Sequence, residues 1–203
     1  MKIELNNLAK YYNINNWVFR NLNWILEGNG LYYVCGSNGS GKSTLCNIIA
    51  GLAYQSEGDI FYYNDKGSIL RKEYIYRHIS IVSPYVYPPS YLKIKDLYKF
   101  NKSFNKKFEV DYNDFISFIN IENDNKYLYE YSSGQRQKIF LAFSILSGKE
   151  IIIFDEPYSY LDSVNEDWLD KKLRDICITK IIIITNTKRQ NFYNKLDLYK
   201  INL

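Results

Sequence analysis

The sequence has 203 residues, a mass of 24.1 kDa and an apolar share of 46%. An apolar share of this size can form a continuous core, so the composition excludes wholesale disorder. The net charge of +4 is too small and too scattered to indicate a nucleic-acid partner. The three cysteines are far apart and have no CxxC or Cys/His spacing, which excludes a zinc site and a disulfide framework.

The N-terminal part of the chain and the segment after the first helix have strand-like patterns. Residues 2–30 and 57–82 alternate apolar and polar side chains, and an Asn-Asp turn signal lies at 64–65. These patterns predict antiparallel strands. The N-terminus, MKIELNN, lacks the apolar core of a signal peptide, and no apolar run approaches the about 20 residues of a spanning helix.

The rest of the chain alternates between buried strands and helices. Short runs rich in Ile, Val and Tyr predict strands that are covered on both faces, at 31–35, 78–82, 151–154 and 181–185. Helical patterns occur at 44–52 and 135–146, and a polar, aromatic segment predicts an inserted helical lobe over roughly 88–148. The alternation predicts an α/β fold with a mainly parallel sheet, an antiparallel β subdomain and an inserted α-helical lobe.

The clearest motif, G-x-x-x-x-G-K-[ST], lies between the first buried strand and the helix that follows it. It consists of Gly36, Ser37, Asn38, Gly39, Ser40, Gly41, Lys42, Ser43 and Thr44. Its glycines let several backbone N–H groups point inward, and the positive end of the helix completes an anion cradle. Lys42 would reach the β- and γ-phosphates, and Ser43 would place its hydroxyl on Mg²⁺. The motif predicts a P-loop NTPase core that binds a nucleotide.

Two carboxylates, Asp155 and Glu156, follow the buried strand at 151–154. The last side chains of such a strand point into the crevice where ligands bind in open α/β sheets. Phosphoryl transfer needs a group that holds the metal and a group that orients water. We therefore expect Asp155 to hold Mg²⁺ and Glu156 to polarise an attacking water.

Between these two motifs lie Ser132, Ser133, Gly134 and Gln135, at the start of an apolar helix. With the preceding Tyr131 they resemble the L-S-G-G-Q signature of ATP-binding-cassette (ABC) ATPases. Small residues at a helix start leave N–H groups open to an anion, and Ser132 adds a hydroxyl donor. The segment 159–162 is similar to the D-loop, S-x-L-D, of the same family.

The resemblance covers nearly the whole chain, so residues 1–203 are expected to form a single ABC ATPase domain. It implies that two such domains sandwich two ATP molecules, each between the P-loop of one subunit and the signature of the other. Tyr12 matches the aromatic residue that stacks on adenine, with Tyr11 as the neighbouring alternative. The implied cofactors are ATP and Mg²⁺. The implied partners are a second copy or a homologous subunit, and separate membrane-spanning subunits that hold the chain on the cytoplasmic face of the membrane.

Two positions depart from the family's pattern. The switch position, usually His, is Asn186, whose amide donates a weaker hydrogen bond to the γ-phosphate than a charged group. The Q-loop position is Pro84, which has no side-chain donor or metal ligand, so Ser83 or water would take its place. The only histidine, His78, receives no functional role. We expect ATP binding to be intact and hydrolysis to be slow or dependent on a partner.

Alternative functions remain open at this stage. The first interpretation is the ATPase subunit of a multi-subunit ABC transporter, similar in size to the haem-exporter type. The second is a non-transport, regulatory ABC protein. The signature and the acidic pair disfavour a small-molecule kinase, and the missing coiled-coil insertion and cysteine clusters disfavour DNA-repair relatives.

Overall fold

The computed structural model describes residues 1–13, 16–84, 88–122, 124–185 and 199–203. The strands of these residues form one parallel and one antiparallel sheet. The parallel strands are β3 (Gly30–Cys35), β5 (Ile79–Val82), β6 (Ile151–Asp155), β7 (Ile181–Thr185) and β8 (Tyr199–Asn202), in the spatial order β5-β6-β7-β3-β8. The antiparallel strands are β1 (Lys2–Asn13), β2 (Asn16–Glu27) and β4 (Glu57–Tyr63), in the order β2-β1-β4.

The parallel sheet separates two hydrophobic clusters. Tyr32 and Val34 of β3 face one cluster, whereas Leu31 and Tyr33 face the other. The residues of β6 and β7 alternate in the same way. Because both faces are covered, every residue of β6 and β7 is buried, which explains why these strands are almost purely apolar.

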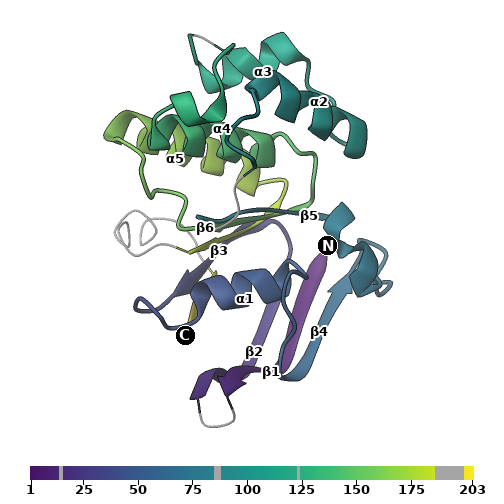
Figure 1. The fold of residues 1–203 in the computed structure, drawn as a ribbon. Coiled ribbons are helices and arrows are strands. Elements are labelled where there is room, and N and C mark those ends of the chain that lie inside the picture. Colours follow the sequence, from purple (N-terminus) through teal and green to yellow (C-terminus); the bar gives the residue numbers. More distant parts are fainter. Residues whose placement is uncertain (14–15, 85–87, 123, 186–198) are drawn as a thin grey trace.

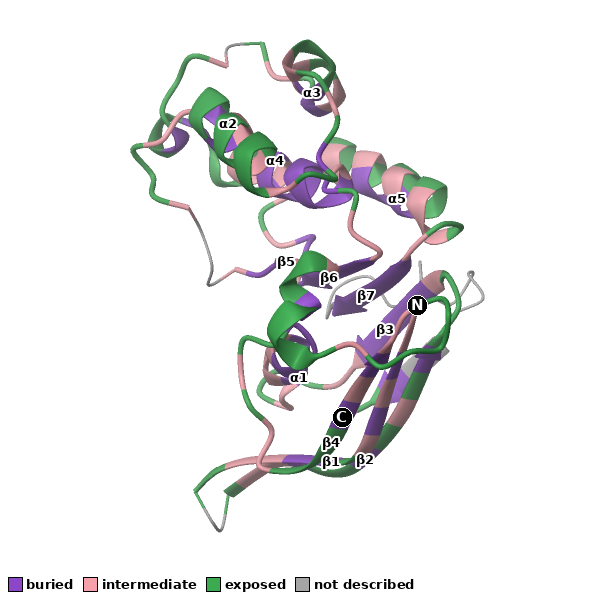
Figure 2. Cartoon of the chain, turned by 90° about the vertical axis from the view of Figure 1, so that its right-hand side faces the viewer, coloured by how far each residue is buried: buried purple, intermediate pink, exposed green. Residues whose placement is uncertain are grey.

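The helices cover the two faces of this sheet unequally. Helix α1 (Lys42–Ile49) lies between the parallel and the antiparallel sheet, where Leu45 and Ile49 pack with Ile3 and Ile60 (Figure 1). On the opposite face, α4 (Ser133–Ile145) and α5 (Ser163–Cys177) lie next to the sheet, and α2 (Ile94–Phe104) and α3 (Tyr112–Ile119) lie farther out. Figure 2 shows buried residues along the strands and on the inner sides of the helices.

The short 3₁₀ helices are η1 (Lys72–Arg77), before β5, and η2 (Leu128–Glu130), before α4. The predicted fold class is confirmed: a parallel sheet, an antiparallel β subdomain and helices inserted between β5 and β6. Two local predictions were wrong. The end of the segment 57–82 is not antiparallel, because β5 pairs in parallel with the buried strand β6. The helix predicted at 44–52 ends at Ile49, because Gly51 has a φ of 75° that breaks the helix.

No helix in the described part of the chain is both long and apolar enough to span a bilayer.

Candidate nucleotide site

The P-loop joins the end of β3 to α1, and two of its glycines lie close to neighbouring side chains. A Cβ on Gly36 would lie 2.3 Å from Ser40 Oγ, and a Cβ on Gly41 would lie 2.3 Å from Val18 Cγ1. Both glycines also have positive φ angles, of 153° and 100°, which other residues rarely adopt. Gly39, at the exposed tip, has a φ of 81°, but a Cβ there would have no other atom within 4 Å. The loop therefore depends on glycine for its shape as well as for ligand access.

The ammonium group of Lys42 lies inside this loop. The residue is only 6% exposed, and its Nζ donates hydrogen bonds to the carbonyl oxygens of Gly36 at 3.0 Å and Ser37 at 2.9 Å. Ser40 Oγ is buried and has no hydrogen-bond partner within the described residues. A fixed cation, an unpaired hydroxyl and the N-terminus of α1 form a donor set that suits phosphate oxygens.

The carboxylate of Asp155 is buried at the end of β6, with 1% exposure. Both of its oxygens accept hydrogen bonds from hydroxyl groups, Oδ2 from Ser83 at 3.1 Å and Oδ1 from Thr185 at 2.8 Å. Thr185 Oγ1 also accepts a hydrogen bond of 2.9 Å from the backbone N–H of Glu156. One threonine hydroxyl thus links the two acidic residues to the end of the neighbouring strand β7.

Glu156 has a left-handed backbone, with a φ of 50°. This conformation is unfavourable for a glutamate, and the hydrogen bond to Thr185 helps to hold it. Burial, followed by the charges of Cys35 and Glu156, raises the pKa of Tyr33 to about 12. The half-buried carboxyl of Glu156 therefore lies near a phenol that stays neutral at physiological pH.

Lys42 of the P-loop and Asp155 of the acidic pair both lie near α1. Burial raises the pKa of the Cys46 thiol well above its usual range, the charge of Asp155 raises it further, and Lys42 opposes the shift. Cys46 is therefore close to both charged groups. Ser43 follows Lys42 in the first turn of α1 and is half-buried. Ser43 and Asp155 supply the hydroxyl and carboxylate oxygens that suit Mg²⁺.

The signature segment lies at the start of α4, on the other side of the parallel sheet from α1 (Figure 1). Ser132 is the N-cap: its Oγ accepts a hydrogen bond from Gln135 N at 3.2 Å, and Gln135 Oε1 accepts one from Ser132 N at 3.1 Å. Ser132, Ser133 and Gln135 are exposed. The capping box satisfies two donors of the helix start without any group from elsewhere in the chain.

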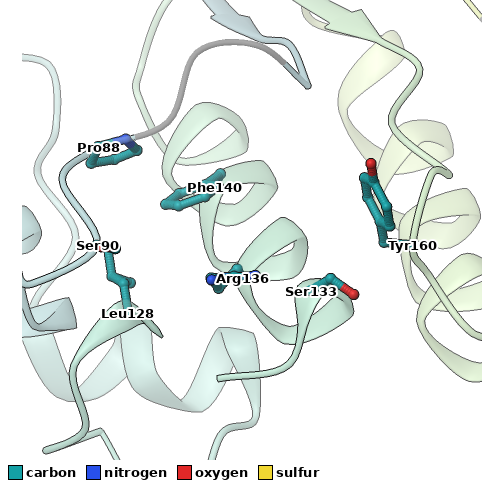
Figure 3. Close-up of a pocket in the computed structure, with 7 residues that line it drawn as sticks. All are labelled: Pro88, Ser90, Leu128, Ser133, Arg136, Phe140 and Tyr160. Carbon is teal, nitrogen blue, oxygen red and sulfur yellow. The ribbon is translucent and has the colours of Figure 1, made fainter. Parts of the chain in front are cut away.

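Contacts connect the start of α4 to the segment after the acidic pair. A Cβ on Gly134 would lie 2.6 Å from the carbonyl oxygen of Tyr160, so only glycine fits there. The buried Gln137 donates a hydrogen bond of 3.2 Å to the carbonyl oxygen of Pro157. Figure 3 shows Ser133, Arg136 and Tyr160 around a cavity of about 390 Å³ beside the signature. The signature and the D-loop segment are thus one packed unit.

Tyr12 lies next to the P-loop helix. It is 69% exposed, its hydroxyl lies 3.5 Å from Thr44 Oγ1, and the ammonium of Lys10 lies 5.1 Å from its ring centre. Tyr11 instead packs edge-on against Trp17, with ring centres 4.7 Å apart. Of the two candidates, Tyr12 has the free ring face beside the phosphate cradle that a purine would need.

From the sequence, Thr185 received no role, and Ser83 was only a substitute for the missing Q-loop side chain. In the structure the hydroxyls of both residues donate hydrogen bonds to Asp155. A hydroxyl at the end of each buried strand was the signal that could have identified both. Asn186 lies outside the described residues. Pro84 follows Ser83 directly, and His78 lies at the opposite end of β5, with its Nδ1 3.3 Å from the carboxylate of Glu150.

Comparisons with known proteins bear on the fold and on the family. The model of the family "ABC transporter" matches residues 19–159. The chain also resembles a Pyrococcus furiosus protein assigned as an ABC transporter ATP-binding protein, at 23% identity and a TM-score of 0.81, over 100% of this chain and 98% of the other.

Two further structures are similar. The ATP-binding subunit of an ABC transporter has a TM-score of 0.82 at 17% identity, over 99% of this chain and 88% of the other. A dimeric ATP-binding cassette in a post-hydrolysis state with ADP and phosphate has a TM-score of 0.77 at 23% identity, over 94% of this chain and 89% of the other. These likenesses show the same fold, and the family model covers more than half of the sequence: the chain belongs to the ABC transporter family.

Proposed function

We propose that this chain is the ATP-binding and ATP-hydrolysing subunit of a multi-subunit ABC transporter, and that residues 1–203 act as one ATPase domain. One observation carries the proposal. The P-loop and the acidic pair converge at the carboxyl edge of the parallel sheet, whereas the exposed signature begins a helix on the opposite face. This division suits an enzyme in which the signature of one copy completes the nucleotide site of another.

In the proposed reaction, the P-loop holds the triphosphate, and the ammonium of Lys42 moves from the loop carbonyls to the β- and γ-phosphate oxygens. Tyr12 stacks on the adenine. Ser43 and Asp155 are the residues that would hold Mg²⁺, which neutralises phosphate charge when it is bound. Glu156 polarises the water that attacks the γ-phosphate. The hydroxyl of Thr185 keeps the backbone of Glu156 in position.

Hydrolysis is proposed to be slow or partner-dependent, because Pro84 and Asn186 replace polar residues of the family's pattern. Ser83 is proposed to replace part of the polar side chain that is missing at Pro84, because its hydrogen bond to Asp155 places a hydroxyl next to the carboxylate. It does not replace a group that reaches the γ-phosphate. Asn186 would supply a neutral amide at that position.

A groove beside the edge strand β5 supports the docking of a membrane subunit. The cavity has a volume of about 440 Å³ and lies between β5, α2 and α4, with Ser80, Leu97 and Phe140 in its lining. Pro88 lines the same groove and follows the Q-loop position closely. In this family the groove at this place receives a coupling helix, so this chain is proposed to be peripheral on the cytoplasmic face of the membrane.

Purification of the tagged chain from detergent-solubilised membranes tests the proposal. A transporter subunit should co-purify with a membrane-spanning protein, and that complex should hydrolyse ATP faster than the isolated chain. The alternative, a regulatory ABC protein without transport, is favoured by the two replaced polar residues, Pro84 and Asn186. It predicts nucleotide-dependent dimers with no membrane-spanning partner and no stimulated turnover.

A further inference from the structure

A third cavity, of about 430 Å³, lies at the opposite end of β5 from the nucleotide site. Its lining comes from η1, from the end of α2 with the residues that follow it, and from the loop before β6. These residues are Tyr76, Arg77, Phe104, Asn105, Lys106, Lys107 and Lys149. Four of these lining residues are cationic and none is acidic. We call this feature the basic cavity.

The walls of the basic cavity are fixed to one another. Asn105 Nδ2 donates a hydrogen bond of 2.7 Å to the carbonyl oxygen of Ser147. Lys149 Nζ donates to the carbonyl oxygens of Tyr76 and Arg77, at 3.2 and 3.0 Å. A Cβ on Gly148 would lie 2.3 Å from the carbonyl oxygen of Lys107. Three segments far apart in the sequence are therefore held in one arrangement, with their positive charges around a common space.

The charges in this cavity are only partly balanced. The carboxylate of Glu150 pairs with Lys107 and also faces His78. Burial lowers the pKa of the Lys149 ammonium, and the positive charge of Lys107 lowers it further, against an opposing effect of Glu150. An anion in the cavity would relieve this repulsion.

Exposed aromatic rings flank the basic cavity. Phe104 is 77% exposed, and its ring lies 4.6 Å from that of Phe100, which is 60% exposed on the same face of α2. On the other side, the guanidinium of Arg77 lies over the exposed rings of Tyr74 and Tyr76. Basic side chains mixed with exposed Phe and Tyr are typical of surfaces that meet the headgroup region of a bilayer.

We propose that the basic cavity binds the phosphate of an anionic phospholipid headgroup, with Phe100 and Phe104 entering the interface beside it. The inference rests on the proposed function, because only a chain held at a membrane meets a bilayer. The cavity is continuous with the proposed docking groove, since Asn105 and Lys149 line both. It lies at the amino ends of β5 and β6, whereas Asp155 lies at the carboxyl end of β6, so lipid binding would leave the nucleotide site free.

Flotation of the purified full chain with vesicles tests this proposal without any membrane subunit. Vesicles of phosphatidylcholine with one third phosphatidylglycerol, by mole, should bind the chain at low salt, and vesicles of pure phosphatidylcholine should not. Lys106→Glu and Phe104→Ser should each reduce binding about fivefold to tenfold. Lys171→Glu, an exposed change on α5 with the same change in charge, serves as the control.

Equal binding to both kinds of vesicle, or an equal loss with Lys171→Glu, would overturn the proposal. A chain that fails to bind vesicles but is retained on immobilised polyglutamate in a Lys106-dependent way would also overturn it. The cavity would then bind an acidic protein segment. Competition by inorganic phosphate distinguishes a soluble anion: displacement at low millimolar phosphate, at constant ionic strength, would show that the cavity takes free phosphate instead. These outcomes are independent of co-purification with a membrane protein, so the two proposals can fail separately.

Discussion

The P-loop edge and the signature segment are two candidate phosphate sites built in opposite ways. At the P-loop edge, Lys42 is buried and hydrogen-bonded to carbonyls of its own loop, and Asp155 is buried and hydrogen-bonded to hydroxyls from two other strand ends. At the signature, Ser132 and Gln135 are exposed, and the hydrogen bonds described for their side chains are to each other's backbone N–H groups. The groups of the first site are held in place within the chain, whereas the second has an outward face that another molecule can use. The difference suggests that binding and assembly can be disrupted separately.

The largest effect is expected from Lys42→Ala. The substitution removes a buried cation from the phosphate cradle, and we expect ATP affinity to fall about 100-fold, since a hydrogen bond to a charged group contributes about 1.5–3 kcal/mol. Isothermal titration with ATP checks this. Lys171→Ala, on the exposed side of α5, is the matched control and should bind as the parent does. Unchanged ATP affinity in Lys42→Ala would contradict a phosphate-binding role for the P-loop edge.

Thr185→Val should slow turnover about tenfold to 100-fold while ATP affinity stays within a factor of three. The valine has a similar shape but leaves an oxygen of Asp155 and the N–H of Glu156 without their hydroxyl partner. Thr185→Ser keeps that hydroxyl and should restore turnover. A steady-state ATPase assay of both variants decides the matter: equal rates would show that the hydroxyl has no positioning role.

Ser132→Ala should weaken ATP-dependent dimers about tenfold without changing ATP binding to the single chain. It also removes a helix cap, which costs about 1 kcal/mol of folding stability. Ser132→Asn separates the two effects, because asparagine restores the cap but not the hydroxyl donor. Thermal unfolding and sedimentation velocity report on them independently. If Ser132→Asn recovers full dimer affinity, the signature hydroxyl does not contact the partner's nucleotide.

The smallest effect concerns Glu150, at the end of the sheet away from both sites. Burial raises the pKa of its carboxyl, but the hydrogen bond and charge of Lys107 outweigh this and leave the pKa below its ordinary value of 4.5. The pairing therefore stabilises the fold above pH 4.5 and is lost as the pH falls through the lower, folded-state pKa.

For Glu150→Gln, we expect a loss of about 0.5 kcal/mol in the free energy of unfolding at pH 7, since the group is partly exposed. The loss should vanish in strong acid. Urea unfolding at several pH values measures it, with the exposed Glu57→Gln as the control. A difference from the parent that stayed constant down to strong acid would contradict the assigned charge pairing.

Much of the fold followed from periodicity and motif order. The Ile-rich strands were predictable because their residues are buried on both faces, and the P-loop was predictable because glycine is required at Gly36 and Gly41. For β5 the patterns conflicted, predicting both the end of an antiparallel segment and a buried strand, since a strand of four residues does not reveal its partner. The links through Thr185 and Ser83 were also hidden, because they join hydroxyls to a carboxylate at sequence separations of 30 and 72.

The central claim, that two copies share ATP between the P-loop of one and the signature of the other, is tested most directly with Glu156→Gln. This change should stop turnover but keep the nucleotide bound. Light scattering of the variant saturated with magnesium and ATP should report a mass twice that of one chain, and a second Ser132→Ala substitution should lower the dimer fraction. A strictly monomeric Glu156→Gln protein under saturating nucleotide would contradict the account.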